Sequence, residues 1–294
     1  DGKKEPKKRK TTLRGVELDF KEVGSGQPLL VLPDYSYSRS YLELPLTGLA
    51  RVAKVFFIDL PPLNKFSGLK QSAAGMPVYP IDKLCEAFDE LRKQYKQKRV
   101  AILAHGISCW IAMRYATKYP QHVSHIILVS PWASGQGYSK GIKRLEGRGK
   151  ERKLEEMWKF AQSLQYRGSK PVYQAKSAKE QMALARMAYT LYYANPADMY
   201  AAWTWPNLLR PMGQCTVPMQ FDVVKEKKTP APVLTITGAN AVFTNVQEAK
   251  KITKHYPRAH LSVYRRSRRA PLIEENERFT KEVTRFFKKY KVRK

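Results

Sequence analysis

Short apolar runs alternate with amphipathic segments along most of the chain. Mainly apolar runs with the length of buried strands occur at 28–34, 55–61, 100–103, 123–130 and 233–238. Before the third run, apolar side chains recur at helical spacing from Ile81 to Tyr95, and residues 110–118 form a second helical segment that Pro120 ends. This alternation predicts one α/β domain with a mostly parallel central sheet flanked by helices.

The alternation breaks off between residues 138 and 228. This stretch has a basic, glycine-containing entry, helical patterns at 154–164 and 179–194, and a proline-rich return. Its aromatic residues either pack onto the core, line a ligand cavity or stack on exposed bases. They are Tyr189, Tyr192, Tyr193, Tyr200, Trp203 and Trp205. The expected organisation is a basic N-terminal tail (1–14), a core in two parts (15–137 and 229–287), a helical insertion (138–228) and a basic C-terminal tail (288–294).

The most informative motif lies where the third apolar run meets a helix. Residues 102–110 read ILAHGISCW and resemble the G-x-S-x-G nucleophile elbow of the α/β-hydrolase family, in which a serine sits on a strained strand-to-helix turn. Gly106 stands where that serine would be. The elbow holds its central residue at positive φ, which glycine adopts freely, so Gly106 is expected to keep the turn and lose the hydroxyl.

Further landmarks of the family recur in order over roughly residues 15–290. The strand that ends in the oxyanion loop is at 28–34, and the next strand, with its Asp-Leu-Pro ending, is at 55–61. The strand that leads to the acid of the triad is at 233–238, and the segment after the triad histidine is at 270–275. The first of them carries Pro33 and Asp34 where the family has His-Gly. The resemblance implies an α/β-hydrolase fold in which the insertion at 138–228 is a helical cap.

All three triad positions carry residues without the required chemistry. The resemblance places Gly106 at the nucleophile, Ala241 at the acid and Arg269 at the histidine. The mechanism needs a hydroxyl, an imidazole and a carboxylate. Pro33 also lacks the backbone N–H that an oxyanion hole would use. We therefore expect a pseudo-hydrolase with no catalytic residues and no enzyme activity.

Two alternatives remain open at this level. In the first, the chemistry has moved to Ser108 or Cys109, which lie close to His105 in the sequence. In the second, the chain is a pseudoenzyme receptor that binds a small acidic ligand in the old pocket. Reactivity of Ser108 or Cys109 with an active-site label would favour the first, and ligand binding that Arg269→Ala abolishes would favour the second.

Charge is a second strong signal. Lys and Arg number 54 against 25 Asp and Glu, which gives a formal net charge of +29 and an isoelectric point of about 10.0. Residues 1–10 and 288–294 carry net charges of +4 and +5, which leaves +20 for the body of the chain. Because such a body repels itself and phosphates would neutralise it, RNA is the preferred partner.

Candidate RNA contacts lie at both ends, at the entry of the insertion and in the loop before Ala270, at the rim of the old active site. They are Lys3, Lys4, Lys7, Lys8, Arg9, Lys10, Lys140, Lys143, Arg144, Arg148, Lys150, Arg152, Lys153, Arg265, Arg266, Arg268, Arg269, Lys288, Lys289, Lys291, Arg293 and Lys294. No RRM, KH, zinc-finger or heptad pattern accompanies them, so recognition by shape and backbone charge is expected. We expect a structural subunit of a large ribonucleoprotein, with a mitochondrial (organellar) ribosome as the preferred particle. Its partners would be ribosomal RNA and neighbouring proteins, with no small-molecule substrate.

The remaining features exclude or limit other classes. The histidines and cysteines show no metal-ligand spacing, so neither a metal nor a cofactor is expected. No apolar stretch approaches the roughly 20 residues of a transmembrane helix, although the basic tails could touch anionic lipids. The three widely spaced cysteines indicate a reducing compartment inside the cell. The chain begins at Asp1, which allows for a removed organellar leader, while the N-terminal KKEPKKRK also resembles a nuclear-import signal.

Overall fold

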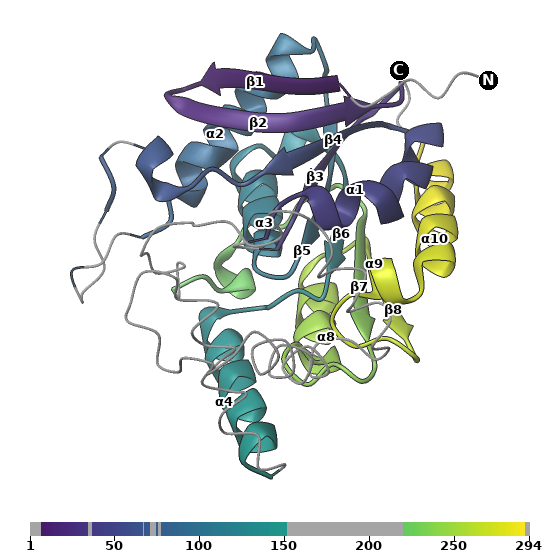
Figure 1. Ribbon diagram of the computed structural model, residues 1–294. Coiled ribbons are helices and arrows are strands. Elements are labelled where there is room, and N and C mark those ends of the chain that lie inside the picture. The colour runs from purple at the N-terminus through teal and green to yellow at the C-terminus, as the bar shows by residue number, and fades with distance from the viewer. Residues whose placement is uncertain are drawn as a thin grey trace, which may run out of the picture.

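The computed structural model describes residues 7–34, 37–66, 68–70, 75, 78–151 and 220–291. These residues form an eight-stranded sheet with helices on both faces (Figure 1). The strand order is β1-β2-β4-β3-β5-β6-β7-β8. From β4 to β8 every neighbouring pair is parallel, and β2 and β1 add an antiparallel edge. The α/β fold class with a mostly parallel sheet, expected from the sequence, is confirmed.

Five of the six parallel strands are buried along almost their whole length, and the edge strand β8 is mostly half-buried. The strand bounds are β1 Lys7–Leu13, β2 Val16–Val23, β3 Pro28–Leu32, β4 Lys54–Asp59, β5 Val100–His105, β6 Val123–Val129, β7 Val233–Gly238 and β8 Ala259–Tyr264. Every residue of β3, β5, β6 and β7 is buried. Strands covered by helices on both faces have no solvent side, so they read as continuous apolar runs.

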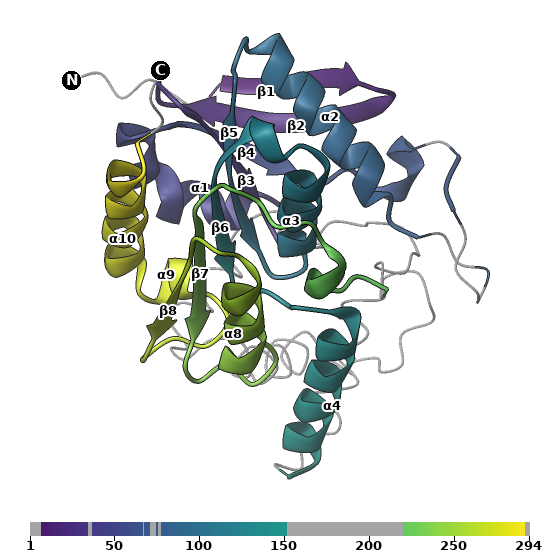
Figure 2. The same cartoon turned by 180° about the vertical axis from the view of Figure 1, so that it is seen from behind.

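Helices cover the two faces in separate groups. The helix bounds are α1 Ser40–Leu46, α2 Ile81–Gln94, α3 Ser108–Lys118, α4 Gly135–Glu151, α8 Val246–His255, α9 Pro271–Glu274 and α10 Asn276–Lys289. Short 3-10 segments lie at Thr47–Arg51, Leu63–Lys65, Pro120–His122 and Val223–Lys225. Helices α2, α3 and α8 share one apolar core with the sheet, and α1 and α10 share the other (Figure 2). The helical spacing seen in the sequence near Ile81 thus corresponds to α2, whose apolar side faces the first core.

The parallel strands define two edges of the sheet. We call the edge where strands β3 to β8 begin the amino edge, and the edge where they end the carboxyl edge. Helices α2, α3 and α8 each connect one parallel strand to a later one, so they start at the carboxyl edge and return to the amino edge. Helix α4 starts after β6 at the carboxyl edge and extends away from the sheet (Figure 1).

The N-terminal segment departs from the sequence prediction. Residues 1–14 were expected to be a basic tail, but Lys7–Leu13 form strand β1, which pairs with β2 along its length. A two-residue turn at Arg14 (φ 52°) and Gly15 (φ 75°) joins the strands, and positive φ at both positions is what a type I′ hairpin turn requires. Lys7 lies opposite Glu22 and Lys10 opposite Asp19, so opposite charges support the pairing.

The other domain boundaries are affected less. Lys288 and Lys289 belong to α10, so the C-terminal segment expected at 288–294 begins inside a helix. The expected start of the insertion at residue 138 falls within α4. The helical patterns at 154–164 and 179–194 and the aromatic group from Tyr189 to Trp205 lie outside the described residues.

A buried histidine lies within the second core. His125 is part of β6, and its ring is 5.4 Å from that of Phe286 and 4.7 Å from that of Phe287, centroid to centroid. Burial lowers the pKa of His125 to about 4. The imidazole is therefore neutral at neutral pH and acts as a core side chain.

Candidate functional site

The strand-to-helix turn after β5 has the geometry expected of a nucleophile elbow. Strand β5 ends at His105, Gly106 has φ +61°, and α3 begins at Ser108. The N–H of Gly106 donates to the carbonyl of Val129 at 2.9 Å, which ties the turn to the end of β6. The predicted positive φ at Gly106 is confirmed, and it explains why glycine is tolerated there without strain.

Asp34 fills the space that a side chain at position 106 would need. A Cβ built on Gly106 would lie within 2.6 Å of the Asp34 carboxyl carbon and both of its oxygens. Asp34 follows β3 by two residues and is only 2% exposed. The carboxylate of Asp34 thus occupies the position from which a nucleophilic hydroxyl would project.

The same carboxylate is held by the backbone of the turn and by Arg269. The N–H of Ile107 donates to Asp34 Oδ1 at 3.0 Å, and the Arg269 guanidinium donates to Asp34 Oδ2. In a nucleophile elbow, the N–H of the residue after the nucleophile is an oxyanion-hole donor. That donor is here bound to an internal anion.

Arg269 belongs to this buried site and lies away from the surface. It is 9% exposed, and its guanidinium carbon lies 4.7 Å from the centre of the Phe243 ring. The prediction that Arg269 contacts RNA is therefore wrong, because its charge pairs with Asp34 inside the protein. The sequence could not reveal this, since a run of arginines gives no sign of which side chain turns inward.

The loop that carries Arg269 is anchored by two carboxylates. Glu274 accepts from the N–H groups of Arg268 and Ala270, and Glu275 accepts from the N–H of Arg266 and the hydroxyl of Ser267. These bonds fix the backbone, which in turn fixes the direction of the Arg269 side chain.

The loop of Arg269 also packs tightly against the end of β7. A Cβ on Gly238 would come within 2.6 Å of backbone atoms of Ser267 and Arg268. The N–H of Asn240 donates to the carbonyl of Ser267 at 3.2 Å. Ala241, the residue expected at the acid position, follows Asn240 in this loop. The fold thus brings the segments that carry the three triad positions to the carboxyl edge.

His105 is part of a closed hydrogen-bond chain. Its Nδ1 lies 2.7 Å from the Tyr41 hydroxyl, which also accepts from the N–H of Asp34, and its Nε2 lies 3.0 Å from the carbonyl of Arg269. A carbonyl can only accept, so Nε2 carries the proton and Nδ1 accepts from Tyr41. Burial lowers the pKa of His105 to about 4, so the ring is neutral and neither nitrogen is open to act as a base.

The two alternative nucleophiles are also buried. Ser108 and Cys109 are both 0% exposed. The Ser108 hydroxyl donates to the carbonyl of Pro33, and the Cys109 thiol lies 3.2 Å from the carbonyl of Ala104. Burial raises the pKa of the Cys109 thiol well above its usual value, so a thiolate is disfavoured.

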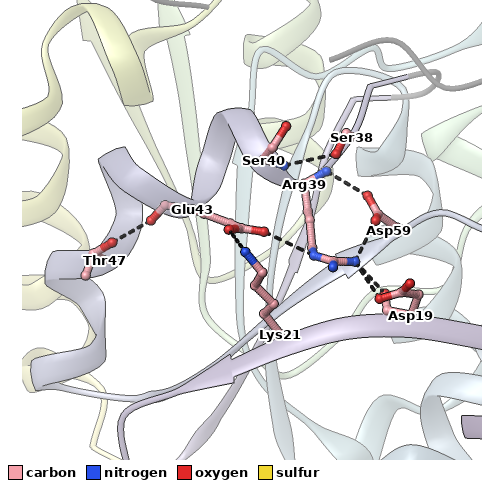
Figure 3. Close-up of polar contacts among 8 residues, drawn as sticks. All are labelled: Asp19, Lys21, Ser38, Arg39, Ser40, Glu43, Thr47 and Asp59. Atoms are coloured by element: carbon pink, nitrogen blue, oxygen red, sulfur yellow. Dashed lines mark hydrogen bonds and ion pairs between the residues drawn. The ribbon is translucent and has the colours of Figure 1, made fainter. Parts of the chain in front are cut away.

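An ion-pair network fixes the start of α1, which carries Tyr41 and directly follows the segment that contains Asp34. Arg39 is 8% exposed, and its guanidinium bonds Asp19 of β2 at 2.8 Å and Asp59 of β4 at 2.5 Å (Figure 3). Its Nε also donates to Glu43 at 3.1 Å. The network clamps the start of α1 onto two strands, and α1 carries the Tyr41 hydroxyl that contacts His105.

Other predicted RNA contacts fall into two groups. Lys7, Lys8, Arg9 and Lys10 on β1, Lys140 and Lys143 on α4, Arg265 and Arg266, and Lys288, Lys289 and Lys291 are exposed. Arg144 and Arg268 are only partly exposed, and the Arg144 guanidinium donates to the carbonyls of Val242 and Phe243 at 3.1 and 2.9 Å. The predicted RNA contact of Arg144 therefore competes with these internal bonds.

Some predicted contacts cannot be placed. Lys3, Lys4, Arg152, Lys153, Arg293 and Lys294 lie outside the described residues, as do the side chains of Arg148 and Lys150. Within the described ranges, no three His, Cys, Asp or Glu side chains are grouped so that they could hold a metal ion. Among the described helices, none combines the length and the apolar character needed to cross a bilayer.

Comparisons with known proteins agree with this architecture. A family model described as alpha/beta hydrolase fold matches residues 46–263. The solved structure of an alpha/beta fold family hydrolase from Bacillus anthracis str. Sterne superposes with a TM-score of 0.68 at 15% identity, covering 95% of this chain and 99% of that one. The esterase RhEst1 from Rhodococcus sp. ECU1013 gives a TM-score of 0.68 at 16% identity, covering 97% and 99%.

Sequence relatives match at low identity, and one of them over only part of its length. The 1-acylglycerol-3-phosphate O-acyltransferase ABHD5 of Mus musculus is 28% identical over 131 residues, which are 44% of this chain and 37% of the relative. This chain thus spans little more than a third of that relative's length. A proline iminopeptidase of Heyndrickxia coagulans is 24% identical over 277 residues, covering 88% of this chain and 90% of the relative. Since the family model covers well over half of the chain, the protein belongs to the alpha/beta hydrolase fold family.

Proposed function

We propose that this protein is a non-catalytic member of the family that serves as a basic, RNA-associated structural subunit of a large ribonucleoprotein, with a mitochondrial ribosome as the preferred particle. One observation carries the non-catalytic part. The carboxylate of Asp34 lies in the space of the nucleophile's side chain and accepts from the Ile107 N–H. An acyl group could neither be attacked at this point nor place its oxyanion on that donor.

The electrostatics of the site support the same conclusion. Acyl transfer by this fold needs a base that takes a proton from the nucleophile. His105 is neutral, but both of its ring nitrogens are engaged, and Arg269 at the expected histidine position cannot act as a base at neutral pH. Asp34 and Arg269 neutralise each other, so the site has the character of a structural ion pair.

The displaced-nucleophile alternative has less support. Ser108 and Cys109 are fully buried, and each is bonded to a backbone carbonyl. A fluorophosphonate and iodoacetamide, applied to folded protein, test this alternative directly. Labelling of Ser108 or Cys109 would contradict the non-catalytic proposal.

The receptor alternative is weakened by the ion pair at the site. A small acidic ligand would have to compete with Asp34 for Arg269, because the guanidinium is already paired. Saturable binding of a small carboxylate that Arg269→Ala abolishes, with RNA binding unchanged, would favour the receptor over our proposal.

The RNA part of the proposal rests on charge. The net charge of +29 is far larger than the two chain ends contribute, and no catalytic use of the cations is evident in the described site. Sedimentation of a native extract through sucrose, with and without RNase, tests it. Co-migration with a large particle that RNase disrupts is the expected result, and migration as a free protein in both gradients would contradict it.

A further inference from the structure

Loops that lead into the parallel strands gather basic side chains at the amino edge. Arg51 precedes β4, Lys98 and Arg99 precede β5, and Lys227 and Lys228 precede β7. All five side chains are exposed. They come from distant parts of the sequence, and they share one edge because parallel strands all begin on the same side of a sheet.

The ends of the helices add more positive charge to the same edge. Lys96 follows α2, Lys254 lies in the last turn of α8, and Lys288 and Lys289 end α10, all four of them exposed. Helices α2 and α10 both end toward the side of the molecule where the C-terminus lies (Figure 2). Lysines at helix ends are favoured by the helix dipole, so each is unremarkable alone. This edge is distinctive because these lysines lie at the same edge as the basic loops that lead into the parallel strands.

Contacts between elements show that these positions adjoin. The Tyr290 ring, just after α10, lies 5.2 Å from the guanidinium carbon of Arg258, which precedes β8. The Thr117 hydroxyl, in the last turn of α3, donates to the carbonyl of Lys227 at 3.5 Å. The ends of α3 and α10 therefore abut the entries to β7 and β8. We call the nine exposed residues named in the two preceding paragraphs the amino-edge face.

Little negative charge opposes this face. Within the described part of the chain, none of its nine members forms an ion pair. The carboxylates beside it are already engaged. Asp89 is buried and bonds Arg92, and Glu226 is buried and pairs with Arg114. The face thus presents cations that have no internal counter-charge among these residues.

We propose that the amino-edge face binds the phosphate backbone of double-stranded RNA, an inference that rests on the proposed RNA-associated function. The face crosses the six strands from β4 to β8, which at about 4.8 Å per strand gives a width of about 24 Å. At roughly one phosphate per 3.4 Å along each strand of a duplex, that width matches several phosphates.

The surface chemistry favours a duplex over single strands or a membrane. No Phe, Tyr or Trp among the described residues is exposed, so this part of the protein offers no platform on which unpaired bases could stack. Interfacial membrane binding also relies on Trp, Phe or Leu inserted beside the basic residues. Exposed lysines and arginines alone suit recognition by phosphate position and charge.

The basic residues at the carboxyl edge make a natural comparison. There, Arg269 pairs with Asp34 and Arg144 donates to two backbone carbonyls, so both are committed internally. Lys65 and Lys70, in the segment after β4, and Lys250 and Lys251, in the first two turns of α8, are also exposed toward that edge. None of the four is a predicted RNA contact, and they supply a control with the same number of removable charges.

The test compares two purified full-length variants with the unaltered chain. The first carries Arg51→Gln, Lys98→Gln, Lys228→Gln and Lys288→Gln, and the control carries Lys65→Gln, Lys70→Gln, Lys250→Gln and Lys251→Gln. Filter binding to an RNA duplex of about 20 base pairs is measured from 50 to 300 mM salt. Each lost phosphate contact reduces the slope of log K against log salt by about 0.9, so the loss of four contacts in the first variant should lower the slope by about 3.6 and the affinity at least tenfold. The control is expected to change little.

Several outcomes separate this inference from the function on which it rests. Equal loss of duplex affinity in both variants, or loss only in the control, would show that the amino-edge face is not the RNA site, although the protein would still bind RNA. Tighter binding of single-stranded RNA than of the duplex would overturn the duplex as ligand. Binding of vesicles of phosphatidylserine and phosphatidylcholine in preference to RNA, with the same loss in the first variant, would assign the face to a membrane. No salt-dependent RNA binding by the unaltered chain would contradict the proposed function itself. Thermal unfolding of all three proteins checks that the substitutions leave the fold intact.

Discussion

Replacing Gly106 by alanine is expected to destabilise the protein far more than its small size change suggests. The new Cβ would lie within 2.6 Å of three atoms of the Asp34 carboxyl group, so the carboxylate must move. Its displacement breaks a buried ion pair with Arg269, which typically costs about 3–5 kcal/mol. Positive φ at a residue with a Cβ adds about 1–2 kcal/mol. The expected loss in the free energy of unfolding is therefore about 4–7 kcal/mol.

A double-mutant cycle separates the two contributions. In an Asp34→Ala background no carboxylate opposes the new Cβ, so Gly106→Ala should cost only the backbone term of about 1–2 kcal/mol. The coupling energy between the two positions is then about 3 kcal/mol or more. If Asp34→Ala alone does not fold, Asp34→Ala with Arg269→Met removes both charges and serves as the background.

The matched control is Gly15→Ala. Gly15 also has positive φ (+75°), but nothing lies within 4 Å of a Cβ built there. Its substitution should cost about 1–2 kcal/mol in every background. Unfolding free energies come from urea titrations followed by circular dichroism. A cost for Gly106→Ala that agrees within about 0.5 kcal/mol between the two backgrounds would refute the claim that Asp34 occupies the nucleophile's space.

Three further predictions concern buried groups. Burial lowers the pKa of His105 and His125 from 6.5 to about 4, so the unfolded state binds more protons between these values. The free energy of unfolding should therefore be highest above pH 6.5 and fall by about 2–3 kcal/mol per histidine by pH 4.5. In urea titrations at a series of pH values, His125→Asn should remove the part of this decrease that comes from His125. Mass spectrometry should find Cys109 alkylated and Ser108 phosphonylated only to background levels in folded protein at pH 8, and rapid labelling of native protein would contradict this. Arg39→Ala should cost more than about 3 kcal/mol, because it leaves its partner carboxylates without their cation, whereas a loss below about 1 kcal/mol would show that the network is not coupled to folding.

Local patterns were sufficient to predict most of the core. Strands β3, β5, β6 and β7 are buried on both faces, so their apolar runs are visible without tertiary information. Helix α2 shows its buried side through helical spacing alone. Strand β1 was missed for the opposite reason. Five of its seven residues are exposed on an edge, so no apolar alternation marks it as a strand.

The candidate site was predicted only in part. Gly106 could be placed because its neighbours form a strand, a turn and a helix that are continuous in sequence. The partners that fill the site could not, because Asp34 and Arg269 are 235 residues apart. Neither local sequence indicates that the Asp34 carboxylate contacts both the turn at Gly106 and the loop that carries Arg269.

The sequence by itself determined the α/β architecture, the glycine turn and the large positive charge, because periodicity, backbone preference and composition are properties of short segments or of simple sums. Only the tertiary structure decided how these features are used. Chain crossings bring Asp34 into the nucleophile's space and turn Arg269 inward, so one residue of a basic run becomes part of the core. The parallel topology collects isolated cations such as Arg51, Lys98 and Lys228 along a single edge. Those relations depend on distances between residues far apart in the chain, which no local pattern specifies.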